Sequence, residues 1–161
     1  MNIFEFAMEK EKLSEERYRD LAQQCNNNGV KTILNMLADE EYKHYIMVHA
    51  MAKNQKPAEA ETNVLSDAQQ VFGKMREERD TLGCDIGQVK LYIKAQEFEE
   101  ESEQYYREKA KEVTDNYQKR ILTKMAEEER KHYNMLEHII QFMQRPERWL
   151  EDREWSHHEP Y

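Results

Sequence analysis

Six residues with metal-binding side chains recur at a fixed interval along the chain. Adding 88 to the numbers of the first three gives the other three, and the full set is Glu11, Glu41, His44, Glu99, Glu129 and His132. Each one interrupts a stripe of apolar or aromatic residues at helical spacing, as Glu11 does between Ala7 and Tyr18. Carboxylates on the buried face of a helix are costly unless a cation compensates them. The set therefore predicts a pair of metal cations inside the protein.

The spacing within the set suits the coordination of two ions. Glu41 and His44 are three residues apart, which places them on one helix face about one turn apart, and the second Glu-x-x-His pair repeats this arrangement. Each pair offers one ion an oxygen and a nitrogen, while the second carboxylate oxygen can reach the other ion. Glu11 and Glu99 would each bind one ion terminally. Such ligands suit iron or manganese better than structural zinc, and four carboxylates balance two divalent charges.

Long amphipathic helices must position these side chains. Apolar residues recur at helical spacing in four segments, at about 2–25, 30–53, 88–114 and 117–144. The run Asn26-Asn27-Asn28-Gly29 separates the first two, because Asn and Gly tolerate the left-handed conformation that ends helices. The run Thr114-Asp115-Asn116 separates the last two. Short connections of this kind predict antiparallel helical hairpins.

We therefore predict an all-α protein, an antiparallel four-helix bundle over residues 1–145 built from two repeated hairpins. The hairpins would occupy about 2–53 and 88–144, joined by a long crossover connection over about 54–87. Eight of sixteen positions are identical between 7–22 and 95–110, and nine of fifteen between 33–47 and 121–135. Because the register does not slip, we expect a pseudo-twofold axis that brings like residues together at the centre of the bundle.

The crossover and the tail carry weaker signals. Ser66-Asp67 is expected to cap a shorter helix that continues to about Asp80, with the Gly-rich run 82–87 ending it. The tail, residues 146–161, contains Trp149 and Trp155, which we expect to dock on the bundle or on a neighbouring subunit.

Composition restricts the class of protein. Charged residues make up 35% of the chain and the mean hydropathy is −1.09, but the helical spacing of the apolar residues assigns this charge to solvated helix faces. The net charge of −9 argues against nucleic acid or an anionic membrane as a partner. No stretch reaches the roughly 18 apolar residues of a membrane span.

A cytoplasmic location is expected on two grounds. The first residues lack the basic and apolar regions of a signal peptide. Cys25 and Cys84 lie far apart, form no metal motif and suit a reducing compartment. Cys25 falls near the end of an apolar stripe, so we expect a packed thiol there.

Together these motifs resemble the rubrerythrin-like branch of the ferritin-like di-iron carboxylate superfamily. The likeness covers nearly all of residues 3–145 and is carried by Ala7-x-Glu9-x-Glu11 followed by Tyr18, Glu41-x-x-His44, Ala95-x-Glu97-x-Glu99 followed by Tyr106, and Glu129-x-x-His132. One Glu from each of two helices and a Glu-x-x-His from each of the others is the general ligand pattern of such bundles. The resemblance implies a centre of two iron ions that reacts with dioxygen or hydrogen peroxide. Di-manganese and mixed iron–manganese centres share these ligands.

The chain departs from the rubrerythrin pattern in two places. Rubrerythrins proper carry a rubredoxin domain with four cysteines, which two isolated cysteines cannot build, so the electron donor would be a separate, rubredoxin-like protein. Rubrerythrins also resemble one another in an extra glutamate one turn beyond the ligand of the third helix. This chain has Ser102 at that position, with Glu103 beside it.

Other residues near the set admit two interpretations. Tyr18 and Tyr106 either hydrogen-bond the ligands and relay electrons or serve as packing residues, and packing is the expectation. Glu15 and Glu103 either support or replace the terminal ligands, or pair on the surface with the arginine four residues on.

Two further pairs are expected to lie away from the set. Glu9 and Glu97 are rotated away from the ligand face, so we expect them in solvent. His157 and His158 in the tail could bind metal, but a surface chain end is the expectation.

The leading functional hypothesis is a cytoplasmic di-iron oxidoreductase of peroxidase or ferroxidase type. It would reduce hydrogen peroxide or dioxygen while oxidising Fe(II), as a homodimer or a higher homo-oligomer. Ferritin-like iron storage or delivery uses the same centre and is the first alternative. A helical interaction module without metal is the second.

Overall fold

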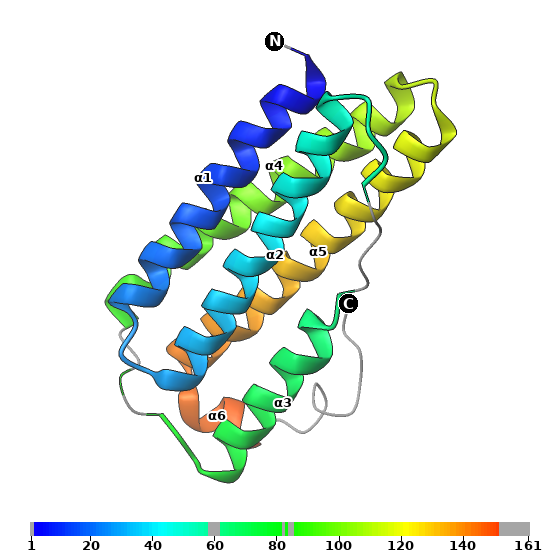
Figure 1. Ribbon diagram of the computed structural model, residues 1–161. Helices are drawn as coiled ribbons and strands as arrows, with labels where there is room; N and C mark the ends of the chain where they lie inside the picture. The colour runs from blue at the N-terminus through cyan, green and yellow to red at the C-terminus, as the bar shows by residue number, and fades with distance from the viewer. Residues whose placement is uncertain (1, 58–61, 82, 84–85, 152–161) are drawn as a thin grey trace.

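The computed structural model of the protein is a bundle of four long helices (Figure 1). It describes residues 2–57, 62–81, 83 and 86–151. The long helices are α1 (Ile3–Gln24), α2 (Asn28–Ala52), α4 (Val89–Glu112) and α5 (Asn116–Gln144). The shorter ones are α3 (Val64–Glu77), the 3-10 helix η1 (Ile86–Gln88) and α6 (Pro146–Glu151). The predicted all-α, ferritin-like class is confirmed, and the four long helices lie close to their predicted bounds.

The two hairpins pack side by side. α1 packs along α2 and α4 along α5, while α1 also contacts α4 and α2 contacts α5. In Figure 1 the chain leaves α2 at the upper end, descends through α3 and begins α4 at the lower end. α2 and α4 therefore run in the same direction, which only a connection as long as the bundle permits. The predicted crossover is thus visible in the path of the chain.

Side-chain caps begin three of the long helices. Oδ1 of Asn2 accepts hydrogen bonds from the backbone N–H groups of the first turn of α1, and Asn27 and Asp115 do the same for α2 and α5. The first hairpin turns where the sequence predicts, but for a different reason. None of Asn26, Asn27 and Asn28 has a positive φ, so the break comes from capping by Asn27 rather than from a left-handed residue.

Gly29 lies inside α2 and permits a close approach of α3. A Cβ atom at this position would lie 2.4 Å from Sδ of Met75. Any side chain at this position would therefore require the Met75 side chain to move.

The cap predicted for α3 is wrong. The helix begins at Val64, before Ser66 and Asp67, and the hydroxyl of Thr62 accepts a hydrogen bond of 3.2 Å from the Val64 N–H. Ser66 instead donates to the carbonyl of Asn63. The capping preference of Ser66 and Asp67 was outweighed by the burial of Val64 against the bundle. Because Val64 packs there, the helix begins two residues before Ser66. Cys84 lies outside the described residues.

Two apolar clusters fill the bundle, one at each end. The upper apolar cluster, at the upper end in Figure 1, includes Phe4, Met51 and Ile121. The lower apolar cluster includes Phe72 of α3 and Trp149 of α6. The six predicted ligands lie in the layer between them, because along each long helix they separate residues of one cluster from residues of the other. The polar layer is therefore enclosed by apolar packing above and below.

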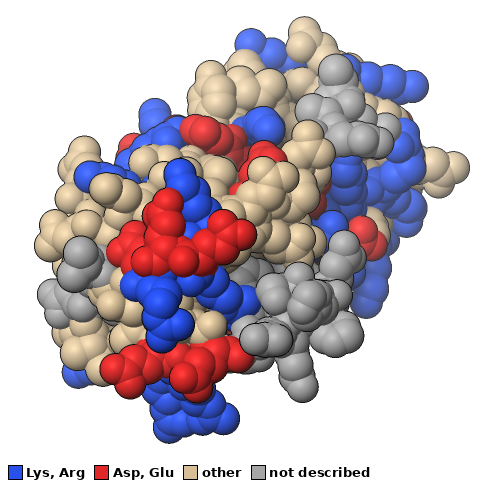
Figure 2. All heavy atoms as spheres, turned by 90° about the horizontal axis from the view of Figure 1, so that it is seen from below, with Lys and Arg blue, Asp and Glu red and all other residues tan. Residues whose placement is uncertain are grey.

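The surface carries the charge that the sequence assigns to it. Figure 2 shows the lower end of the bundle, where Lys and Arg lie among Asp and Glu. Glu9 and Glu97 are exposed and the thiol of Cys25 is buried, as predicted. Within the described ranges no helix combines the length and the apolar character needed to cross a bilayer.

Trp149 anchors α6 to its own bundle. The side chain is 4% exposed, and its ring contacts Phe142 and Phe72 at centroid distances of 4.9 and 5.6 Å. The Arg76 side chain donates two hydrogen bonds to the Trp149 carbonyl. The predicted docking is thus confirmed for Trp149, while Trp155, His157 and His158 lie outside the described residues.

Trp149→Ala should lower the free energy of unfolding by about 3–5 kcal/mol, the usual cost of removing a buried large aromatic side chain. Urea denaturation followed by circular dichroism measures this change. The exposed Glu147, in the same helix, gives the control Glu147→Ala, which should stay within about 0.5 kcal/mol of the parent. Equal stability of the two variants would contradict the anchoring role.

Candidate metal centre

The structure brings all six predicted ligand residues to one place. Each of the four long helices contributes, and none of the six residues is more than 3% exposed. The apolar clusters on either side of this layer keep the carboxylates from water, which is the condition under which uncompensated charge is most costly.

The six residues form two overlapping groups of four. One contains Glu11 and His44, the other contains Glu99 and His132, and both contain Glu41 and Glu129. In each group the possible ligand atoms lie within 4.8 Å of one another. The shared pair are the carboxylates of the Glu-x-x-His motifs. Glu41 and Glu129 would therefore be available to both of two cations held by this cluster.

The two groups have matching geometry. Nδ1 of His44 lies 2.8 Å from Oε1 of Glu129 and 3.5 Å from the glutamate of α1. Nδ1 of His132 lies 2.8 Å from Oε1 of Glu41 and 3.6 Å from the glutamate of α4. Each histidine therefore faces the bridging carboxylate of the other hairpin, as the pseudo-twofold repeat requires.

Two tyrosines hydrogen-bond the terminal carboxylates, contrary to the expectation that they only pack. The Tyr18 hydroxyl donates to Oε1 of Glu99, and the Tyr106 hydroxyl donates to Oε1 of Glu11. Burial, together with the neighbouring carboxylates, raises the pKa of both tyrosines well above the ordinary value. Both phenols thus stay protonated and hold one oxygen of each terminal glutamate, leaving the other oxygen for a cation.

The carboxylates differ in their affinity for protons. Burial and the nearby negative charges raise the pKa of Glu41 and Glu129 well above the usual value. Burial also opposes ionisation of the terminal pair, but His132 and hydrogen bonds lower the pKa of Glu99 to about 2. The neighbouring Glu41 carboxyl group and the charge of His44 likewise outweigh burial and lower the pKa of Glu11. Without metal, the raised pKa values of Glu41, Glu129 and His44 favour bound protons that offset part of the buried negative charge.

The residues present fit a pair of cations. The Oε2 atoms of all four glutamates of the cluster are buried without a hydrogen-bond partner in the described part of the chain. Buried oxygens are almost always paired, so this number in one layer requires an explanation. Oxygen atoms with one imidazole nitrogen in each group are the donors preferred by iron and manganese.

Glu15 and Glu103 do not join the cluster. Glu15 pairs with Arg19 at 3.3 Å, and Glu103 accepts hydrogen bonds from Arg107 and Arg130. The surface-pairing interpretation therefore holds, although Glu103 is buried. The position of the extra rubrerythrin glutamate is occupied by the buried Ser102, so Glu103 does not replace it.

Glu128 was missed by the sequence analysis. Its Oε2 lies 2.8 Å from Nε2 of His44, on the side of the ring opposite the cluster. Burial disfavours its charge, but the contact with His44 prevails and lowers the pKa of Glu128, so the group is a carboxylate that accepts the ring N–H. Residue 40, which lies 88 positions earlier, is also a glutamate, and this repeated position could have identified Glu128 as a candidate.

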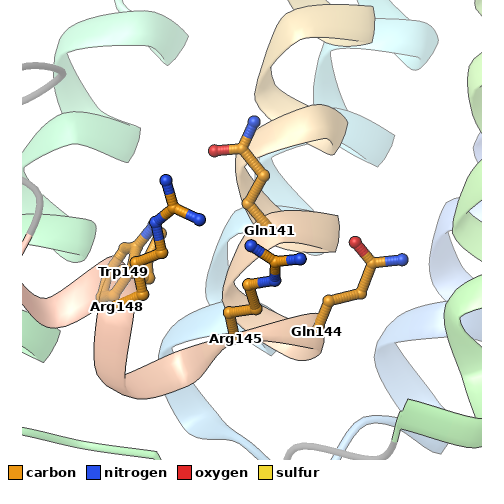
Figure 3. A pocket seen from close by; sticks show the side chains of 5 residues that line it. All are labelled: Gln141, Gln144, Arg145, Arg148 and Trp149. Atoms are coloured by element: carbon orange, nitrogen blue, oxygen red, sulfur yellow. The ribbon is translucent and has the colours of Figure 1, made fainter.

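A separate pocket of about 310 Å³ lies at the end of α5. Figure 3 shows its lining, with the guanidinium groups of Arg145 and Arg148 beside the amides of Gln141 and Gln144. None of the six cluster residues lines it. We therefore assign the chemistry to the buried cluster.

Comparison with known proteins agrees with this geometry. The sequence model of the Rubrerythrin family matches residues 2–140. Searches of curated proteins and of solved structures gave no match. The family match spans all four long helices up to the last turn of α5, and with them every residue of the buried cluster. The chain therefore belongs to the rubrerythrin family, within the ferritin-like di-iron superfamily.

Proposed function

We propose that the protein is a di-iron oxidoreductase that reduces hydrogen peroxide or dioxygen while oxidising Fe(II). The observation that carries this proposal is the pair of overlapping four-residue groups that share Glu41 and Glu129. Glu11 and His44 would complete the ligands of one ion, and their repeat mates those of the other. A bridged pair of ions can supply two electrons to one oxidant, and this is the chemistry that the irons contribute when bound.

The protein's own residues contribute charge balance, orientation and exclusion of water. Four carboxylates neutralise two ferrous ions, while the apolar clusters above and below keep bulk solvent out. Tyr18 and Tyr106 hold the terminal carboxylates in place. A cluster fixed in this way needs little rearrangement when the charge of the ions changes.

A small pocket next to the cluster favours a small molecule as the oxidant. It has a volume of about 160 Å³, lies between α2 and α5, and is lined by His44, Glu128 and Met47 among others. A water molecule occupies about 30 Å³ in the liquid, so peroxide or dioxygen fits easily. On the α1–α4 side, the hollow beside Glu99 and Tyr18 has no room for water. In this proposal the oxidant approaches past His44.

The electron donor in this proposal is a separate protein of rubredoxin-like type, and the chain acts as a homodimer or a higher homo-oligomer. Iron storage remains the competing proposal because it uses the same ligands. Measurement of the size in solution separates the two, since storage requires a closed shell of many subunits or an enclosing compartment.

Anaerobic loading with Fe(II) followed by a stoichiometric pulse of hydrogen peroxide should produce the absorption of protein-bound ferric iron, with two Fe(II) oxidised for each peroxide reduced to water. The reason is that the shared carboxylates hold both irons close enough to donate one electron each. Rapid-mixing absorption spectroscopy measures the amplitude. Protein that holds iron but shows no spectral change would reject the oxidoreductase proposal while leaving the metal centre intact.

A further inference from the structure

The inner geometry of the cluster obeys the repeat, but the contacts behind the two histidines do not. Nε2 of His44, the ring nitrogen that faces away from the cluster, lies 2.8 Å from Oε2 of Glu128. By the repeat, the mate of Glu128 is Glu40, which should stand behind His132. In the described part of the chain, however, Nε2 of His132 has no hydrogen-bond partner, although the residue is 0% exposed.

Glu40 is engaged elsewhere. Its carboxylate accepts a hydrogen bond from the Thr62 hydroxyl and lies 3.0 Å from Nζ of Lys43. Thr62 belongs to the crossover connection, which breaks the symmetry of the two hairpins. The residue 88 positions later is Leu150, an apolar residue of α6 that packs against the lower apolar cluster. At the position that matches Thr62, the second half therefore offers Glu128 an apolar side chain in place of a hydroxyl.

A carboxylate behind a metal-binding histidine changes how the ring binds. Oε2 of Glu128 lies where it can accept the Nε2–H of His44. When a cation takes the place of a proton on Nδ1, this contact holds the ring in the tautomer whose Nδ1 lone pair faces the cluster. It also makes that nitrogen a stronger donor to a cation. Loss of such a partner typically lowers metal affinity by about 10–100-fold. His132 lacks this support.

We propose that Glu128 makes the two cation positions unequal, so that the position at Glu11 and His44 binds a divalent ion first and more tightly than the position at Glu99 and His132. Glu128 acts as a positioning residue, since it contacts the histidine and not the ion. The inference rests on the proposed metal centre and adds an order of filling, which the inner ligands alone do not provide.

The test is a titration of the metal-free protein with Co²⁺, followed by visible absorption and by calorimetry. The parent should bind in two steps that differ by at least about 10-fold in affinity. Glu128→Gln should weaken the tighter step by about 10–100-fold, so that the two steps have similar affinities. Glu40→Gln is the matched control, because it changes the repeat mate in the same way, and it should leave both steps unchanged.

Two single-position variants assign the steps. Glu99→Ala keeps the group with His44, and Glu11→Ala keeps the group with His132, so the first should retain the tighter binding. The reverse order, or equal weakening by Glu128→Gln and Glu40→Gln, would overturn the inference. General destabilisation would weaken both steps of Glu128→Gln together, and thermal unfolding of the metal-free variants shows it directly. Absence of any Co²⁺ binding to the parent would instead refute the metal centre itself.

Discussion

Glu129→Ala should abolish binding of both metal ions. Glu129 belongs to both four-residue groups, so its removal would deprive both ions of a ligand. Loss of Glu11 or Glu99 would deprive only one ion of a ligand. Elemental analysis after anaerobic loading with Fe(II) and desalting should find a pair of ions in the parent and none in the variant. The peroxide-dependent absorption should disappear with them.

The same variant should lose the stabilisation that metal provides. A ligand present at a thousandfold excess over its Kd adds about 4 kcal/mol to the folded state, and protein without a site gains none of this. The control is Glu97→Ala, on α4 two residues before a terminal ligand, because this glutamate is exposed. Retention of both ions by Glu129→Ala would contradict the bridging role, and loss of metal in Glu97→Ala would show that the effect is not local.

Metal affinity should rise steeply with pH. Burial, followed by the charges of neighbouring carboxylates, raises the pKa of Glu41 and Glu129 well above the ordinary value, so in the metal-free protein these groups keep their protons to a higher pH than ordinary carboxyl groups. Cations need the ionised form, and binding must displace at least these two protons. Since the displaced protons compete with metal, each unit of added pH should multiply the overall binding constant by about 100-fold over the range in which both groups are protonated. The rise should end once the pH exceeds both raised pKa values.

Calorimetric titration in two buffers of different protonation enthalpy measures the number of protons released on metal binding. Glu41→Gln is the informative variant, because its amide keeps the shape but holds no titrating proton, so the release should fall by about one. A binding constant that does not change between pH 6 and 8 would show that the bridging carboxylates are already ionised before metal arrives.

The amino-acid sequence alone predicted the four long helices and the six residues that meet in the buried cluster. Helical periodicity is local, so each inward face can be read directly, and the 88-residue repeat excluded a chance pattern of glutamates. Positions such as Glu11 and Glu99 followed because an acid within an apolar stripe must lie inside the bundle.

Only the tertiary structure decided which groups meet across helices. The hydrogen bond from Tyr18 to Glu99 joins residues 81 positions apart, and that from His44 to Glu128 joins residues 84 apart. Neither can be read from periodicity, which gives the face of a helix but not the rotamer or the partner helix that a side chain reaches. The contact of Thr62 with Glu40 depends further on the path of the crossover. The 88-residue repeat therefore predicted which residues form the cluster. The crossover connection, which has no counterpart in the second hairpin, decided that the contacts behind the two histidines differ.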